Sequence, residues 1–215
     1  MKMRILSSLL ACGMALQAQA PLKIGVINCA TGTQAPIGEY MSNGYKLALE
    51  DLQKKGIKVE LVTEDDTGKP QVSMSAMEKL VTRDRVAAVV GPYSSACANA
   101  VSKLAEKYKV PLLVPVASKE DITRQNQKYV FRLSATTEDY ASILISMAQK
   151  LGKPKTMAIL NENTDFGTSG AKSAKAYAAQ VGLQVVAEEA YASGSPDYRS
   201  TLAKIKGKNP DLVFM

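Results

Sequence analysis

Short runs of β-branched and other apolar residues alternate along the chain with longer stretches whose apolar residues recur three or four positions apart. This alternation is typical of βαβ units, which build parallel sheets covered by helices. The runs predict strands at residues 22–28, 57–64, 86–91, 110–114, 129–133, 156–161, 183–188 and 211–215. We therefore predict an α/β fold with parallel sheets.

Three of the longer stretches carry apolar residues at helical spacing. These residues are Ile37, Met41, Tyr45, Ala48 and Leu52 in the first, Met74, Met77, Leu80 and Val81 in the second, and Ala171, Ala174, Ala178 and Val181 in the third. Such spacing turns one face of each helix toward the sheet. Gly56 and Gly182 follow the first and third stretches, and we expect these glycines to end the helices.

The strand and helix pattern occurs twice, which predicts two lobes. We assign residues 21–134 to the N-terminal lobe and residues 135–215 to part of a second lobe, with the polar stretch 134–139 as a hinge. Two open parallel sheets joined by a crossover hold ligands between the carboxyl ends of their strands. Functional residues are therefore expected in the loops that follow the strands.

The first twenty residues have the pattern of a secretory signal peptide. Lys2 and Arg4 precede a mostly apolar segment at 5–16 that is too short to span a bilayer, and Ala18-Gln19-Ala20 supplies small residues for cleavage. This pattern predicts export to the periplasm. Leu9-Leu10-Ala11-Cys12 also resembles a lipobox, so a lipoprotein anchored through Cys12 is the alternative.

Charge and composition exclude several classes of function. The formal net charge is +7, but the lysines and arginines are interspersed with acidic residues, so we expect no nucleic-acid partner. The chain has no histidine, which removes the commonest zinc ligand and the usual base of a hydrolytic triad. We expect no metal or other cofactor. Cys29 and Cys97 either form a disulfide or, as we favour, remain buried free thiols.

Two segments resemble enzyme motifs without meeting their requirements. Residues 167–173 look like a phosphate-binding loop, but Ala171 stands where that motif requires the glycine before the lysine. Glu64-Asp65-Asp66 resembles a carboxylate cluster, although an acidic turn at the end of a strand explains it with fewer assumptions. Because no nucleophile with a base is evident either, we predict that the protein is not an enzyme.

Three loops rich in small and hydroxyl-bearing residues, 31–38, 92–97 and 115–119, leave the same edge of the predicted sheet. Ser94 and Ser95 lead into a helix, where free backbone N–H groups and a hydroxyl suit a carboxylate. Alternatively, one of these serines only caps its helix. In the third loop, the Ala117 carbonyl and the Ser118 hydroxyl suit an ammonium group.

Several motifs occur together in a fixed order. They are Lys23-Ile24-Gly25-Val26, Thr31-Gly32, Gly38, Asn43-Gly44, Asp65-Asp66, Pro70, Gly91-Pro92, Ser94-Ser95, Pro115, Ala117-Ser118 and Asp165-Phe166-Gly167. Over residues 22–215 the chain resembles the type I periplasmic binding proteins of branched-chain amino-acid ABC transporters, the Leu/Ile/Val-binding group. The resemblance implies the two-lobed fold of that family, with a second lobe that is incomplete because the family's continues beyond Met215.

The resemblance also implies a ligand site. It assigns the ligand carboxylate to Ser95, the ammonium to Ala117 and Ser118, and a closing aromatic ring from the second lobe to Phe166. The remaining candidates are two neighbours of Ser95 and a residue that replaces an aromatic side chain of several relatives: Ser94, Ala96 and Ile37.

Some features depart from the family pattern. A disulfide that some members form between the positions of Gly68 and Ser94 cannot form here, and Lys119 adds a charge near the pocket. The ligand therefore need not be leucine, isoleucine or valine.

We expect a monomer that captures a small amino acid or related carboxylate, closes by a hinge motion and delivers the ligand to an ABC transporter permease. A sensory module of the same fold, reporting to a receptor, is the alternative. Residues 21–134 should be the more ordered lobe. The last strand should pair beside 156–161 and leave the next sheet edge bare.

Overall fold

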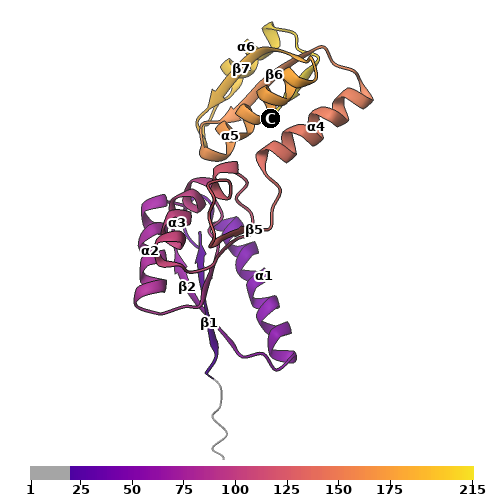
Figure 1. The fold of residues 1–215 in the computed structure, drawn as a ribbon. Coiled ribbons are helices and arrows are strands. Elements are labelled where there is room, and N and C mark those ends of the chain that lie inside the picture. The colour runs from indigo at the N-terminus through magenta and orange to yellow at the C-terminus, as the bar shows by residue number, and fades with distance from the viewer. Residues whose placement is uncertain (1–19) are drawn as a thin grey trace, which may run out of the picture.

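A computed structural model describes residues 20–215 as two lobes, each built on a parallel sheet flanked by helices (Figure 1). The chain passes once from the first lobe to the second, between β5 and α4. The predicted α/β fold with two parallel sheets is confirmed. The predicted signal peptide and the alternative lipidated Cys12 concern the N-terminal segment, which lies outside the described residues except for Ala20.

The first lobe contains five strands and three α-helices. Its elements are β1 (Leu22–Asn28), α1 (Ala35–Lys54), β2 (Val59–Asp65), α2 (Pro70–Thr82), β3 (Ala88–Val90), α3 (Ser95–Tyr108), β4 (Leu112–Val114), the 3-10 helix η1 (Glu120–Ile122) and β5 (Val130–Arg132). All strands are parallel in the order β2-β1-β3-β4-β5. The order reverses direction between β1 and β3, and open parallel sheets bind ligands at the carboxyl ends beside such a point.

The core of the first lobe lies between the sheet and the α2–α3 pair, with α1 on the opposite face (Figure 1). Met77 and Leu80 of the predicted α2 face are fully buried there. The predicted face of α1 is less well covered, because its apolar residues are half-buried and Ala48 is exposed. Gly56 and Gly182 follow the ends of α1 and α5 with positive φ, as expected for residues that end a helix.

The second lobe has a three-stranded sheet. Its elements are α4 (Thr137–Leu151), β6 (Thr156–Glu162), α5 (Asp165–Gln180), β7 (Gln184–Tyr191), α6 (Arg199–Gly207) and β8 (Leu212–Phe214). The strand order is β7-β6-β8, so the last strand pairs beside β6 as predicted. Three residues of the predicted α5 stripe, Ala171, Ala174 and Ala178, pack against α4 and β6 in the buried core. The fourth, Val181, follows the end of α5 and is exposed, so its place in the stripe was wrong.

Some predicted boundaries were wrong. Half of the predicted hinge, 134–139, belongs to α4, whose first turn is fixed by reciprocal hydrogen bonds between Thr136 and Asp139. The strands predicted at 86–91, 110–114 and 129–133 are each three residues long, although residues beside them still form single hydrogen bonds to the neighbouring strand, such as the Leu112 N–H to the Tyr129 carbonyl at 2.7 Å. That the first lobe is the more ordered one stays a prediction.

Cys29 and Cys97 are buried free thiols, as favoured from the sequence, and burial raises the pKa of both. None of the helices within residues 20–215 has the length and apolarity that crossing a bilayer requires. In that same part of the chain, His, Cys, Asp and Glu side chains form no cluster suited to a metal ion.

Candidate functional site

A cleft of about 470 Å³ opens where the loops after β1 to β4 of the first lobe face β6 and α5 of the second lobe. This volume suits a small-molecule ligand. The cleft is lined by Gln34, Gly68, Tyr93, Ser94, Ser95, Ala96, Val116, Ala117, Ser118, Tyr140, Glu162, Thr164, Asp165, Phe166 and Ser193.

The two serines at the start of α3 differ in their hydrogen bonds. Ser94 is the N-cap residue, and its hydroxyl accepts from the Cys97 backbone N–H at 3.2 Å. Ser95 is the first helical residue and is 4% exposed; its hydroxyl accepts only a long 3.4 Å bond from the Lys119 N–H. Capping therefore falls to Ser94, while the Ser95 hydroxyl can still bond strongly beside the free N–H groups of the helix.

The loop after β4 supplies the second pair of polar groups. The Ser118 hydroxyl donates to the Val116 carbonyl at 3.0 Å, and the Ala117 carbonyl accepts from the Ser134 hydroxyl at 3.2 Å. Both Ala117 and Ser118 are 3% exposed. Because a carbonyl and a hydroxyl oxygen each have two lone pairs, both groups retain capacity to accept from an ammonium.

A glycine brings the loop after β3 against the end of β1. Gly91 has φ of +106°, and a Cβ at this position would lie 2.0 Å from the Ile27 carbonyl oxygen. Only glycine fits such a close approach in this backbone conformation. This contact sets the course of the chain into Tyr93, Ser94 and Ser95 at the cleft.

The second lobe contributes the end of β6 and the first turn of α5. The Thr164 hydroxyl caps α5 by accepting from the Gly167 N–H at 3.1 Å. A Cβ on Gly167 would lie 2.2 Å from the Glu162 carbonyl oxygen, so only glycine lets the helix pack this closely on the strand end. As a result, Glu162 and Phe166 both reach the cleft, and the Phe166 ring is 49% exposed.

Two neighbouring residues of the first lobe hold the second lobe directly. Lys119 Nζ pairs with Asp165 Oδ2 at 2.7 Å. The Glu120 carboxylate accepts from three hydroxyls, those of Thr137 at 2.7 Å, Ser173 at 3.1 Å and Ser169. Burial alone would raise the pKa of Glu120, but bonds from Ser169 and Thr137 outweigh that effect and lower the pKa.

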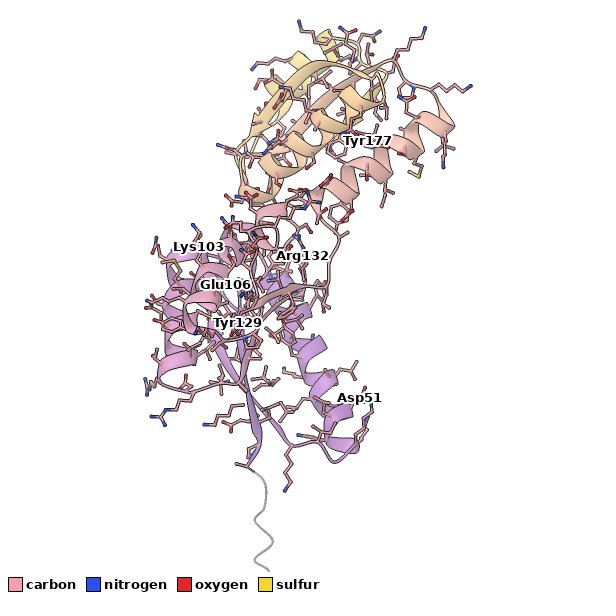
Figure 2. All side chains as sticks on the ribbon, in the orientation of Figure 1. Asp51, Lys103, Glu106, Tyr129, Arg132 and Tyr177 are labelled. Carbon is pink, nitrogen blue, oxygen red and sulfur yellow. The ribbon has the colours of Figure 1, made fainter. Side chains whose placement is uncertain are left out.

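Arg132 of β5, which is labelled in Figure 2, supports the segment that carries these contacts. One of its guanidinium nitrogens donates to the Lys119 carbonyl at 2.7 Å, and another donates to the Thr123 hydroxyl. Because a guanidinium holds several donors in one rigid plane, Arg132 fixes both ends of the segment 119–123 at once. Lys119 and Glu120 therefore contact the second lobe from a segment that Arg132 holds in place.

The acidic residues at the end of β2 are structural, as expected of an acidic turn. Asp65 accepts from the backbone N–H groups of Ala30 and Thr67, each at 2.9 Å. Asp66 accepts from the Ser73 hydroxyl at 2.8 Å, and Glu64 pairs with Lys79. These carboxylates tie neighbouring loops together and line no part of the cleft.

Six of the seven predicted site residues line this cleft: Ser94, Ser95, Ala96, Ala117, Ser118 and Phe166. The seventh, Ile37, lies half-buried in the first turn of α1 and is not among the lining residues. Contact of all seven with a ligand stays a prediction. Lys119 lies near the cleft as expected, but its charge is paired with Asp165.

Sequence reasoning missed several lining residues, among them Gln34, Tyr93, Tyr140 and Glu162. Glu162 ends β6, so the rule that function gathers at strand ends points to it once the second sheet is treated like the first. Gln34 and Tyr93 lie within the loops already singled out. Tyr140 comes from α4, and no signal in the sequence marks it.

A second hollow of about 650 Å³ lies where η1 faces α4 and α5. Its lining is mostly charged and polar, including Arg124, Glu138 and Lys172, and it contains no strand end. The smaller cleft is the better candidate, because it combines the carboxyl ends of strands from both sheets with a helix N-terminus.

Comparison with known proteins gives one consistent result. The family described as periplasmic binding protein matches residues 21–215. The Leu/Ile/Val-binding protein BraC3 of Rhizobium johnstonii is 31% identical over 92% of this chain and 54% of its own length. A solved branched-chain amino-acid binding protein, LivJ of Streptococcus pneumoniae in complex with isoleucine, is 27% identical with a TM-score of 0.79, covering 90% of this chain and 56% of LivJ.

A second solved relative has a different ligand. A solute-binding protein of an ABC transporter from Rhodopseudomonas palustris, in complex with 3,4-dihydroxybenzoic acid, is 28% identical with a TM-score of 0.81, over 91% of this chain and 54% of that protein. The chain spans about half the length of the curated relatives it matches. These named relatives are binding proteins, and none of them is an enzyme.

Proposed function

Because the chain belongs to the periplasmic binding protein family, we propose that it captures a small amino acid or related carboxylate between its lobes and delivers it to an ABC transporter permease. Family membership and the named relatives support an extracytoplasmic location and a role without chemical turnover. Fractionation of expressing cells tests the location, since recovery of the chain only from the cytoplasm would contradict it.

One observation carries this proposal. The buried Ser95 hydroxyl and the N-terminus of α3 face the same cleft as Phe166 of the other lobe. A helix N-terminus favours an anion, and an aromatic ring opposite it covers the apolar part of a ligand. Isoleucine and 3,4-dihydroxybenzoic acid, the ligands of two relatives, both carry a carboxylate, which agrees with an anion site at α3.

A thermal-shift screen tests the proposal. The chain is heated with each of the twenty standard L-amino acids, with benzoate and with 4-hydroxybenzoate. A ligand that binds only the folded state stabilises it by about 2.7 kcal/mol at a hundred times its Kd. For a protein of this size the melting temperature then rises by roughly 5 to 10 °C. If no carboxylate raises it, the proposed function is wrong.

A further inference from the structure

The cleft contains one carboxylate without a protein partner. Glu162 and Asp165 are its acidic lining residues, and Asp165 is paired with Lys119 at 2.7 Å. Among residues 20–215, no lysine or arginine forms a salt bridge with Glu162, and no hydrogen-bond donor reaches its carboxylate. The cleft therefore presents a single uncompensated negative charge to whatever enters it.

Glu162 is held where this charge faces the other lobe. It is the last residue of β6, and the close packing of Gly167 on its carbonyl fixes its main chain. Tyr93 lines the opposite wall. Burial raises the pKa of Tyr93, and the carboxylate of Glu162 contributes in the same direction. The carboxylate of Glu162 is thus close enough to the first lobe for its charge to act across the cleft.

The two walls differ in charge. The first lobe offers the N-terminus of α3 and the Ser95 hydroxyl, which suit an anion, and the neutral Ala117 and Ser118 oxygens, which can accept from an ammonium. The second lobe offers the charged Glu162. A ligand with only a carboxylate would satisfy the first wall and leave Glu162 unpaired as the lobes close, which is costly for a charge removed from water. A ligand that also carries a protonated amine satisfies both walls.

We propose that Glu162 is the counter-ion of a protonated amino group on the ligand, so that the cleft selects compounds with a carboxylate and an amine over plain carboxylic acids. This inference rests on the proposed function and names the residue that distinguishes the two ligand chemistries seen among the relatives. The amine is either the α-amino group or an amine at the far end of a side chain.

Four six-carbon probes separate these cases: hexanoate has no amine, norleucine has an α-amine, 6-aminohexanoate has a terminal amine and lysine has both. Their affinities for the chain are measured by isothermal titration calorimetry. We expect at least one amine-bearing probe to bind about ten- to a hundredfold more tightly than hexanoate, the range for a hydrogen bond to a charged group. The tightest probe identifies the position of the amine.

The substitution Glu162→Gln keeps the size of the side chain and removes its charge. It should lower the affinity of the preferred amine-bearing probe about tenfold or more and leave that of hexanoate nearly unchanged. Glu60→Gln, an exposed glutamate on β2, is the matched control and should change neither affinity. Equal binding of hexanoate and the amines, or an unchanged amine affinity in Glu162→Gln, overturns the inference but leaves the proposed function intact. If none of the probes binds and the thermal-shift screen finds no ligand, the proposed function itself fails and takes this inference with it.

Discussion

Ser94 and Ser95 are adjacent in the chain but have separate roles at the start of α3. The Ser94 hydroxyl accepts a hydrogen bond from the Cys97 N–H, as the side chain of an N-cap residue usually does. The Ser95 hydroxyl accepts only a long bond from the Lys119 N–H and lines the cleft, so it can form a further hydrogen bond with a ligand. One serine therefore contributes mainly to stability, and its neighbour is placed for recognition.

We predict that Ser95→Ala lowers ligand affinity about five- to a hundredfold, because it removes a hydrogen bond worth about 1 to 3 kcal/mol to a charged ligand group. Its free energy of unfolding should change little. Ser94→Ala is the matched control and should lose about 1 kcal/mol of stability with a smaller effect on affinity. Calorimetric titration and denaturant unfolding measure both quantities. The assignment fails if the two variants show the reverse pattern.

At the scale of single residues, the sequence predicted those site residues whose type has few roles at their position in the fold. Serines before a helix and a small residue followed by serine after a strand pointed to Ser95 and Ser118, and both line the cleft. The sequence did not separate Ser94 from Ser95, since that depends on which hydroxyl meets the Cys97 N–H. Ile37 was placed by resemblance alone, and its half-buried position on α1 does not reach the cleft lining.

At the scale of elements, close contacts between strand ends and the following helices position the site. The packing of α5 on the end of β6 depends on Gly167, where a Cβ would lie 2.2 Å from the Glu162 carbonyl oxygen. Gly170, one turn further along the same helix, has no neighbour within 4 Å of such a Cβ. These two glycines therefore offer a controlled comparison.

We predict that Gly167→Ala destabilises the chain by about 1 to 3 kcal/mol, because the added methyl group pushes α5 away from β6. It should also weaken ligand binding by displacing Glu162 and Phe166. Gly170→Ala should instead stabilise the chain by about 0.5 to 1 kcal/mol, since alanine favours helix at an unobstructed site. Urea unfolding compares the two variants. Equal effects would show that the contact with Glu162 does not limit the packing.

The type and order of the strands and helices could be predicted from the sequence, but their first and last residues could be predicted less well. Apolar runs marked all eight strands of residues 20–215, because burial on both faces of a parallel sheet leaves a strong signal. The same runs overstated β3, β4 and β5, because the apolar residues continue past the paired ones and include both the buried Val86 and the exposed Leu133. The polar stretch 134–139 predicted a hinge. Its polar residues Thr136 and Asp139 instead form the capping box at the start of α4.

At the scale of the whole molecule, the two lobes are joined by the covalent connection and by the contacts of Lys119 and Glu120 with the second lobe. These residues directly follow Ser118, a predicted ligand anchor. The loop that would contact the ligand is thus continuous with the segment that sets the approach of the lobes. Arg132 holds this segment next to Ser118 through its bond to the Lys119 carbonyl.

We predict that acid loosens this contact. Hydrogen bonds hold the pKa of Glu120 below its ordinary value of 4.5, so the stabilisation is present above that value and is lost as the pH falls through the lowered pKa. Glu120→Gln should reproduce the acid effect at pH 7 as a larger radius of gyration in small-angle X-ray scattering, with circular dichroism unchanged. Glu60→Gln serves as the control. Identical scattering of the parent and Glu120→Gln would contradict this role.

A structure of the chain with its ligand tests the central claim most directly. The preferred compound from the binding screen would be soaked or co-crystallised and located by its electron density. We predict that it lies between the lobes, with its carboxylate at the N-terminus of α3 within hydrogen-bond distance of the Ser95 hydroxyl, and with Phe166 over its apolar part. A ligand bound in the hollow between η1, α4 and α5, or anywhere else away from Ser95 and Phe166, would contradict the account.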